Sequence, residues 1–365
     1  MKILIDIGHP AHVHYFRNLA DVFIKRGSEV LFTTRDKEVA IQLLDHYGFH
    51  YVNFGRPFKS RIGKIWGVFW FSLRLFIVAL KFKPDMYLNA SQYSAMVAWL
   101  LRKPHISLED TFNMEQVRLY MPFTSIVLTG SYPHPVLGKK DVHYDGYQEL
   151  AYLHPNRYVS DPGIRGILGI NDSENYVILR LVSWAASHDF GHKGISLENK
   201  KKLVSEISRY AKILISSESE LPQELKQFQL RISPEKIHDV LGHCSLLIGE
   251  SYTMASECAV LGVPAIVVHN TKSYYLSDQE QQYGLVFNYS ESEADQKKAI
   301  AKAIELLKTP NIKEEWQKRR WRMLEDKIDP SAFFVWFIEN YPDSLKTMME
   351  NPNYQLRFKQ PTTPI

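Results

Sequence analysis

Three histidines stand close together near the N-terminus, directly after the first apolar run of the chain. His9, His12 and His14 fall within the short stretch "GHPAHVH". Imidazole side chains bind metal ions and transfer protons near neutral pH. A metal site would also need a carboxylate or thiolate from elsewhere, and the sequence marks none. The histidines are therefore expected either to take part in proton transfer or to pack structurally, and no metal ion is predicted.

A second polar stretch follows a strand-like run in the C-terminal half, within "LIGESYTMASECAVLGVPAIVV" from Leu247 to Val268. Ser251 or Thr253 can cap the helix that follows, and the free N–H groups of its first turn suit a phosphate oxygen. Glu257 lies one turn further on, where its carboxylate could accept hydrogen bonds from ribose hydroxyls. The alternative is a helix cap without a ligand and a solvated glutamate.

Short apolar runs alternate with helical periodicity along most of the chain. "KILIDIG" and "SEVLFTTR" predict strands on either side of a helix, and the pattern returns in "YVILRLVS", "KILISSES", "SLLIGES" and "PAIVVHN". Such alternation predicts an α/β fold with two doubly wound, Rossmann-like domains that face each other across a cleft. We expect an N-terminal domain over 1–160, a linker over 161–174, a second domain over 175–329, a returning helix over 330–345 and a tail over 346–365.

The stretch "GESYTMASECAVLGVPAIVV" resembles the nucleotide-binding segment of GT-B glycosyltransferases and of UDP-N-acetylglucosamine 2-epimerases. "DIGHPAHVHYFRNLA" and "YDGYQELAYLHP" are more specifically similar to a GT-B-like family catalogued as a domain of unknown function. This likeness covers Met1 to about Tyr341. The resemblance implies a GT-B architecture and a UDP-sugar ligand. The nucleotide-sugar-binding residues that we infer from it are Gly8, Arg180, Ser183, Ile232, Glu250, Ser251, Thr253, Met254 and Glu257.

The same resemblance indicates two catalytic residues in the N-terminal half. "GHPAHV" is similar to the first loop of a cell-wall N-acetylglucosamine transferase, which implies that His12 accepts the proton of an acceptor hydroxyl. Glu109 in "HISLED" matches the glutamate of the epimerases' "HVEAG" motif. Those epimerases need further acids, but "LNASQYS" offers Asn89 and Ser91 at one of those places. This departure favours a transferase.

Composition excludes several other classes of protein. The chain has 365 residues, with 44 Lys and Arg against 40 Asp and Glu and a formal net charge of +4, so nucleic acid is not an expected partner. Two cysteines, Cys244 and Cys258, are too few for a disulfide framework. "GHPAHVH" is too poor in glycine for a nicotinamide enzyme. "MKILIDIGHP" lacks the pattern of a signal peptide, so a cytoplasmic location is expected.

The segment 61–83 is basic, aromatic and apolar. "IWGVFWFSLRLFIVAL" is shorter than the roughly 20 residues that span a bilayer. No acidic residue stands between Asp45 and Asp85, whereas seven basic residues do: Arg56, Lys59, Arg61, Lys64, Arg74, Lys81 and Lys83. The segment either lies on an anionic membrane surface, which would make the protein peripheral on the inner face of the cell membrane, or is a buried core helix.

Together these features predict a metal-independent glycosyltransferase that uses a nucleotide sugar, with UDP as the expected nucleotide, and needs no cofactor. Its acceptor would be a surface glycan or a lipid-linked molecule, as in polysaccharide biosynthesis. The alternatives are a UDP-sugar 2-epimerase and a non-catalytic assembly protein that binds a nucleotide sugar.

Overall fold

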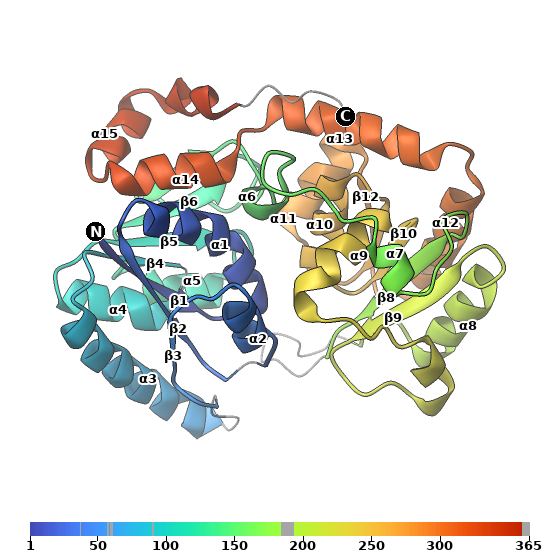
Figure 1. Cartoon of the computed structure of the whole chain (residues 1–365), viewed down its shortest axis with the longest axis horizontal. Coiled ribbons are helices and arrows are strands. Elements are labelled where there is room, and N and C mark those ends of the chain that lie inside the picture. The colour runs from blue at the N-terminus through green and yellow to red at the C-terminus, as the bar shows by residue number, and fades with distance from the viewer. Residues whose placement is uncertain (37, 57, 59–60, 90, 184–192, 360–365) are drawn as a thin grey trace. The chain divides into compact units, whose positions relative to one another are not determined.

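The computed structural model describes residues 1–36, 38–56, 58, 61–89, 91–183 and 193–359. Within these residues the chain forms two compact units (Figure 1). The first unit comprises Met1–Tyr152 and the C-terminal segment from Lys327 onward, and the second comprises Leu153–Asp326. Each unit contains a parallel sheet with helices beside it, so the predicted pair of Rossmann-like domains is confirmed.

The first unit is built on a parallel sheet with the order β3-β2-β1-β4-β5-β6-β7. Its strands are β1 (Lys2–Ile7), β2 (Glu29–Thr34), β3 (Tyr51–Asn53), β4 (Met86–Leu88), β5 (His105–Glu109), β6 (Ile126–Gly130) and β7 (Asp141–Tyr144). Its helices are α1 (Pro10–Lys25), α2 (Glu38–His46), α3 (Arg61–Phe82), α4 (Gln92–Leu100), α5 (Met114–Tyr120) and α6 (Leu150–Leu153), whose last residue begins the second unit.

The second unit is built on a parallel sheet with the order β12-β11-β10-β8-β9. Its strands are β8 (Tyr176–Leu181), β9 (Lys212–Ser217), β10 (Leu246–Gly249), β11 (Ala265–Val268) and β12 (Val286–Tyr289). Its helices are α7 (Ile164–Ile167), α8 (Leu197–Ile207), η1 (Gln223–Phe228), η2 (Pro234–Lys236), α9 (Ile237–His243), α10 (Tyr252–Leu261), α11 (Tyr274–Asp278), η3 (Gln279–Tyr283), α12 (Glu293–Lys308) and α13 (Ile312–Asp326).

The second unit begins earlier than the sequence indicates. Part of the stretch expected to be a linker is folded: it contains α7, and the amide of Asp161 donates to Asp239 Oδ1 at 2.9 Å. Tyr158 bonds to the same carboxylate. Because Asp239 lies on α9, these bonds attach the stretch to the second unit.

The C-terminal segment belongs to the first unit. Its α14 (Pro330–Glu339) packs on α1, and Phe333 and Phe334 are buried beside Tyr144 of β7. The expected tail is helical for most of its length, as α15 (Asp343–Glu350) and η4 (Pro352–Phe358).

Both sheets reverse their strand order at one point, between β1 and β4 in the first unit and between β8 and β10 in the second. In open parallel sheets, ligands bind outside the carboxyl ends of the strands at such a point. The loops after β1, β4 and β10 are therefore the places to look for a site.

Candidate active site

A buried polar cluster lies at the switch point of the first sheet. Asp6 on β1 is fully buried and accepts two hydrogen bonds from Nη1 of Arg35, both at 3.1 Å. Thr33 Oγ1 and Ser91 Oγ donate to the same carboxylate. A buried carboxylate needs such partners to offset its loss of hydration. Asp6 therefore joins β1, β2 and the loop after β4.

Asn89 connects this cluster to the first turn of α1. Its backbone has a φ of 96°, a region that asparagine tolerates better than most residues, and its side chain is buried. Nδ2 of Asn89 donates to the carbonyl of Asp6 at 2.6 Å and to Nδ1 of His12 at 2.7 Å. Unfavourable backbone geometry of this kind often occurs at functional sites.

His12 is held with its proton on the outer nitrogen. The amide of Gly8 donates to Nδ1 of His12 at 3.2 Å, and Asn89 donates to the same atom. Since Nδ1 accepts, the neutral ring carries its proton on Nε2. His12 can then donate a hydrogen bond to a ligand from Nε2, but it cannot accept a proton there. This geometry favours a hydrogen-bond donor role for His12 over the general-base role predicted for it.

The other two histidines of this stretch have contacts that fit a structural role. Nδ1 of His9 accepts from the amide of Ala11 and caps α1. His14 is buried and stacks on Tyr152 with ring centroids 5.5 Å apart. His12, by contrast, bonds to Asn89 of the polar cluster.

Glu109 is buried at the end of β5, and both of its carboxylate oxygens are used. Oε1 accepts from the amides of Thr111 and Phe112 and from Thr111 Oγ1, at 2.8 to 3.0 Å. Oε2 accepts from the hydroxyl of Tyr120 at 2.6 Å. Glu109 therefore stabilises the turn between β5 and α5, and this geometry does not suit the catalytic role predicted for it.

Asp110, the next residue, is the better candidate for a base. Burial and then the neighbouring charge of Glu109 raise the pKa of Asp110 to about 7. The hydroxyl of Tyr15 on α1 lies 3.4 Å from Oδ2 of Asp110, and the rings of Tyr15 and His12 are 5.9 Å apart. A carboxylate with a pKa near 7 can accept and release protons at neutral pH. The sequence shows the adjacent acids Glu109 and Asp110, but it does not show that the amides of the following turn donate to Glu109.

The start of α10 is the corresponding place in the second unit. Oγ of Ser251 caps the helix by accepting from the amide of Met254. Among the described residues, the amides of Tyr252 and Thr253 have no hydrogen-bond partner. Gly249 ends β10 just before this loop, and a Cβ there would lie 2.1 Å from the carbonyl oxygen of Arg180. Glycine is thus required for β10 to approach β8 at this point.

Glu257 lies one turn into α10 and is buried, with only 4% of its surface exposed. Its Oε1 accepts from Nε2 of His238 on α9 at 3.0 Å. The half-buried Ile232 precedes α9 in the chain, separated from it by η2, which Pro234 begins. Burial and the bond to His238 hold Glu257 in one orientation.

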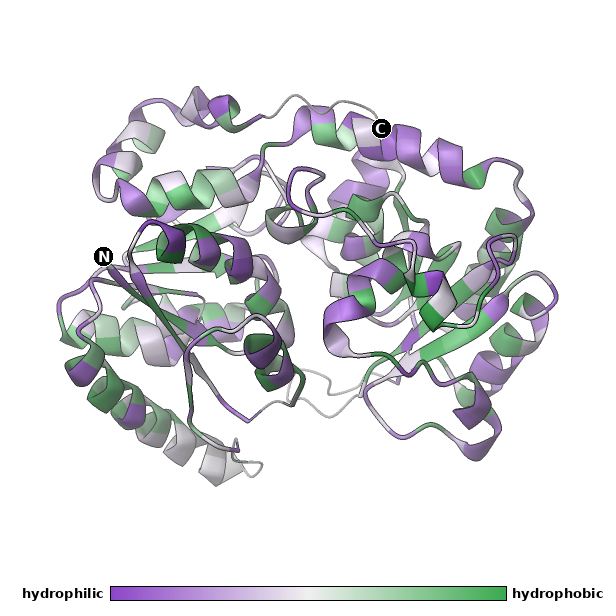
Figure 2. Cartoon of the chain, in the orientation of Figure 1, coloured by the Kyte–Doolittle hydropathy of each residue, from purple (hydrophilic) through white to green (hydrophobic). Residues whose placement is uncertain are grey.

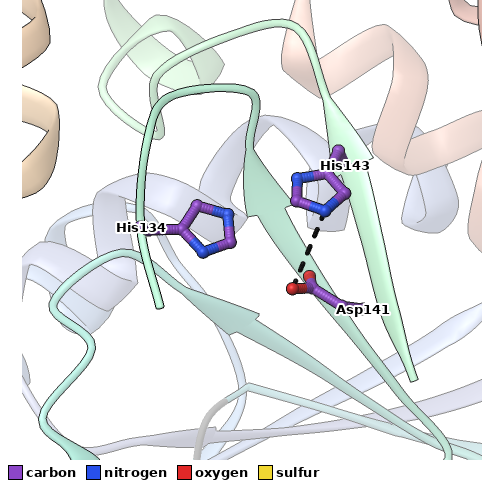
Figure 3. Close-up of side chains that lie close together, drawn as sticks. All are labelled: His134, Asp141 and His143. Atoms are coloured by element: carbon purple, nitrogen blue, oxygen red, sulfur yellow. Dashed lines mark ion pairs between the residues drawn. The ribbon is translucent and has the colours of Figure 1, made fainter. Parts of the chain in front are cut away.

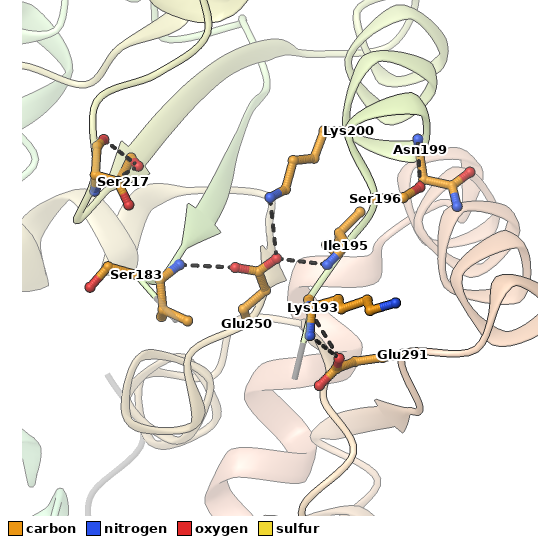
Figure 4. A network of polar contacts seen from close by, with 12 residues as sticks. Ser183, Lys193, Ile195, Ser196, Asn199, Lys200, Ser217, Glu250 and Glu291 are labelled. Atoms are coloured by element: carbon orange, nitrogen blue, oxygen red, sulfur yellow. Dashed lines mark hydrogen bonds and ion pairs between the residues drawn. The ribbon is translucent and has the colours of Figure 1, made fainter. Parts of the chain in front are cut away.

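Glu250 joins two chain segments through hydrogen bonds to its carboxylate (Figure 4). Its carboxylate accepts from the amides of Val182 at 2.9 Å and Ile195 at 2.7 Å, and Lys200 Nζ lies 3.6 Å away. Burial raises the pKa of Glu250, and the charge of Lys200 opposes that shift. Because both oxygens are used, Glu250 positions the segments after β8 and before α8 and is poorly placed for the ligand contact predicted for it.

Arg180 and Ser183 share a partner. Arg180 on β8 forms an ion pair with Glu218 and donates to Ser216 Oγ at 2.9 Å. The amide and hydroxyl of Ser183 contact the other oxygen of Glu218 at 3.1 and 3.3 Å. Arg180 would have to leave this pair to bind a diphosphate, so the geometry favours the structural alternative for it.

Helix α3 is rich in hydrophobic residues (Figure 2). Phe71, Leu75 and Ala79 pack into a core cluster with residues of β4 and α4. A second stripe points outward, with 43% to 65% of each side chain exposed: Trp66, Phe69, Trp70, Leu73, Ile77 and Leu80. Of the helices that the structure describes, none is long and apolar enough to cross a membrane.

Comparison with solved structures defines the class of fold. The UDP-GlcNAc 2-epimerase of Neisseria meningitidis bound to UDP-GlcNAc has a TM-score of 0.68 at 15% identity, covering 96% of this chain and all of that one. The glycosyltransferase SsfS6 of Streptomyces sp. SF2575 has a TM-score of 0.60 at 14% identity, covering 93% of this chain and all of that one. The chain therefore has the GT-B fold that the resemblance implied.

The family follows from the sequence. Residues 1–329 match the family described as "Protein of unknown function (DUF354)", and the chain belongs to that family. A relative, "Uncharacterized protein MJ0665" of Methanocaldococcus jannaschii, is 26% identical over an alignment of 286 residues that covers 73% of this chain and 81% of the relative.

Proposed function

We propose that this protein is a glycosyltransferase that takes a sugar from a nucleotide donor, with UDP as the nucleotide, and adds it to a surface-glycan or lipid-linked acceptor. The observation that carries the proposal is the start of α10. There a capped helix offers the amides of Tyr252 and Thr253 next to a buried carboxylate, Glu257, at the switch point of a parallel sheet.

The donor is assigned to the second unit. The two amides and the positive end of α10 suit the diphosphate, and Glu257 suits the ribose hydroxyls. Thr253 is half-exposed at the same turn, so its hydroxyl can take part. The solved structures of the Neisseria epimerase bound to UDP-GlcNAc and of Staphylococcus aureus MnaA with UDP support the choice of UDP.

Acceptor activation is assigned to the first unit. We propose that Asp110 removes the proton of the acceptor hydroxyl, because its pKa of about 7 allows this at neutral pH. His12 would donate a hydrogen bond from Nε2 to a sugar or acceptor oxygen. The leaving diphosphate would be stabilised by the amides of α10 as its charge develops.

A UDP-sugar 2-epimerase is the second candidate. It is favoured by the adjacent acids Glu109 and Asp110 and by the similarity to the Neisseria epimerase. It is opposed by Asn89, which occupies a place where the resemblance calls for an acid and which is used to orient His12. A non-catalytic protein that only binds a nucleotide sugar is the third candidate.

One experiment separates the three candidates. The purified protein is incubated with a panel of nucleotide sugars in deuterated water, with and without a lipid-linked or glycan acceptor, and the products are analysed by mass spectrometry. A transferase releases nucleoside diphosphate and adds sugar mass to the acceptor. An epimerase incorporates deuterium at the second carbon of the sugar without an acceptor. Binding of a nucleotide sugar with neither product would support the assembly protein.

We also propose that the outer stripe of α3 docks on an anionic membrane at the cytoplasmic face. The stripe from Trp66 to Leu80 exposes aromatic and aliphatic side chains on one side of a helix. Seven basic residues and no acidic ones stand between Asp45 and Asp85. Apolar contact combined with attraction to anionic lipid is the usual basis of interfacial binding. Such docking would bring the enzyme to a lipid-linked acceptor.

A further inference from the structure

A compact group of potential metal ligands lies at the edge of the first sheet, outside the candidate active site. Asp141 and His143 stand two residues apart on β7, which is the edge strand. Alternate residues of a strand point to the same face, so both side chains project together. His134 reaches them from the loop between β6 and β7 (Figure 3). One potential ligand atom from each residue lies within 4.8 Å of the others.

The loop fixes the position of His134. Pro133 and Pro135 flank it and limit its backbone freedom. Its ring stacks on Phe112 with centroids 4.2 Å apart. Nδ1 of His134 lies 2.9 Å from the carbonyl oxygen of Pro135, to which it can only donate. The lone pair is therefore on Nε2, a buried atom with no hydrogen-bond partner in the described part of the chain.

Thr129 on β6 orients the other two ligands. Its hydroxyl donates to Oδ1 of Asp141 at 2.7 Å, and Nδ1 of His143 lies 3.5 Å from the same hydroxyl oxygen. This arrangement favours a proton on Nδ1 of His143 and a lone pair on Nε2. Nε2 of His143 is 3.8 Å from Oδ2 of Asp141. A hydrogen bond from the second ring nitrogen to a fixed acceptor is the usual support of a metal-binding histidine.

We propose that His134, Asp141 and His143 form a binding site for a divalent first-row transition metal ion such as zinc. Two neutral imidazoles and one carboxylate are a ligand set that zinc accepts, with a remaining position for water. A pocket of about 280 Å³, lined by these three residues together with Tyr132 and Val136, gives the ion room.

Binding an ion requires the three ligand atoms, which lie within 4.8 Å of one another, to move closer together. Ligand atoms around a tetrahedral zinc ion are about 3.3 Å apart, given bond lengths of about 2.0 Å. The side chain of His143 is 52% exposed and has freedom to make this adjustment. The ammonium group of Lys140 does not take up these ligands, because its Nζ donates to the carbonyls of Met121 and Thr124 at 2.8 and 2.7 Å. The bound ion would tie the loop carrying His134 to the edge strand.

The test uses the full chain, freed of metal by a chelator and titrated with Zn²⁺ by calorimetry and with Co²⁺ by visible absorption. We expect about one equivalent of Zn²⁺ to bind in the micromolar range or tighter, and the melting temperature to rise with bound metal. Thr129→Val should weaken binding about 10- to 100-fold, the usual effect of losing a supporting hydrogen bond to a metal ligand. His134→Gln and His143→Ala should weaken it further.

His50→Ala is the matched control, because His50 is an exposed imidazole of the same unit outside the group. It should bind Zn²⁺ as the parent protein does. The proposal is overturned if the parent protein binds neither Zn²⁺ nor Co²⁺ in the micromolar range. It is also overturned if His134→Gln and His143→Ala, with unchanged melting temperatures in the absence of metal, keep the parent affinity. The outcome is independent of the proposed transferase activity.

Discussion

Neighbouring carboxylates of the first unit have different surroundings. Glu109 accepts hydrogen bonds on both oxygens, from the turn that follows β5 and from Tyr120, whereas Asp110 is half-buried next to Glu109 and Tyr15. Loss of hydration and a neighbouring negative charge both drive a carboxyl group towards its protonated form. At the scale of the residue, this difference makes Asp110 the group that titrates near neutral pH.

Asp110→Asn should lower turnover at least about 100-fold, the lower end of general-base contributions. Because the base must be deprotonated, the activity of the parent enzyme should rise with pH through about 7. Between about pH 4 and pH 7, the raised pKa keeps Asp110 protonated in the folded state, whereas the unfolded state has lost this proton. The contribution of Asp110 to the free energy of unfolding therefore falls as the pH rises through that range.

Asp110→Asn should therefore be more stable than the parent protein at pH 8, and the difference should shrink towards pH 4. Thermal melting across that range, together with pH–rate profiles, checks both effects. A variant with the parent's turnover and the parent's pH dependence of stability would remove Asp110 from both roles.

Glu257→Gln tests the donor site at the same scale. The amide keeps the size of the side chain and can still accept from His238, but it loses the charge that strengthens bonds to ribose hydroxyls. UDP binding should weaken by about 1.5 to 3 kcal/mol, which calorimetry measures directly. Glu305→Gln, an exposed carboxylate on α12, is the control and should bind UDP as before. Unchanged affinity in Glu257→Gln would show that Glu257 does not touch the nucleotide.

At the scale of the element, α3 differs from an ordinary surface helix in that its exposed side carries large apolar side chains. Its inner face is held by the core cluster around Phe71 and Leu75, so the outer stripe is not needed to keep the helix in place. Exposed apolar stripes of this size on a soluble surface usually mark an interaction site. The basic residues that the sequence carries between Asp45 and Asp85 favour an anionic lipid surface as the partner.

Trp66→Glu combined with Trp70→Glu should abolish flotation with anionic vesicles and leave the melting temperature nearly unchanged, because the two side chains are 62% and 43% exposed. Binding of the parent protein should rise with anionic lipid content and fall with salt, since screening shortens the attraction. Val159→Glu with Ile167→Glu, two exposed apolar positions of the second unit, is the matched control and should float like the parent. A parent protein that stays off vesicles, or that dimerises through this face, contradicts the membrane proposal.

At the scale of the whole molecule, the chain leaves the first unit at Leu153 and returns to it at Lys327. The returning segment is part of the first unit's core: Lys327 pairs with Asp145 at 3.0 Å, and Phe333, Phe334 and Phe337 are buried. The first unit thus depends on residues from both ends of the sequence.

Ending the chain at Asp326 should unfold the first unit and leave the second folded. Truncating one buried phenylalanine costs about 3 to 5 kcal/mol. Losing three therefore removes about as much free energy as the whole stability of an ordinary domain, which is about 5 to 15 kcal/mol. Limited proteolysis with mass spectrometry should show cleavage within residues 1–152 and protection of 153–326. Phe333→Leu, a milder change at the same contact, should lower the melting temperature without unfolding. A truncated chain with both units protected would contradict this dependence.

Local sequence was sufficient for the main outline of the fold. Short apolar runs predicted β1, β2, β8, β9, β10 and β11, because a strand that is covered by helices on both faces consists of consecutive apolar residues. The cap at Ser251 was also predictable, since a cap depends on residues only a few positions away. Strands β6, β7 and β12 were not among the predicted strands, and the second unit starts at Leu153 instead of at the expected boundary.

Roles that depend on distant partners required the tertiary structure. The proton of His12 is placed by Asn89, 77 residues away, and Arg180 is held by Glu218, 38 residues away. The exposed stripe of α3 and the grouping of His134 with Asp141 and His143 likewise follow from how the elements pack. A sequence pattern shows which side chains can do chemistry, but hydrogen-bond partners and burial, which decide tautomer, pKa and access, are set only when remote segments meet.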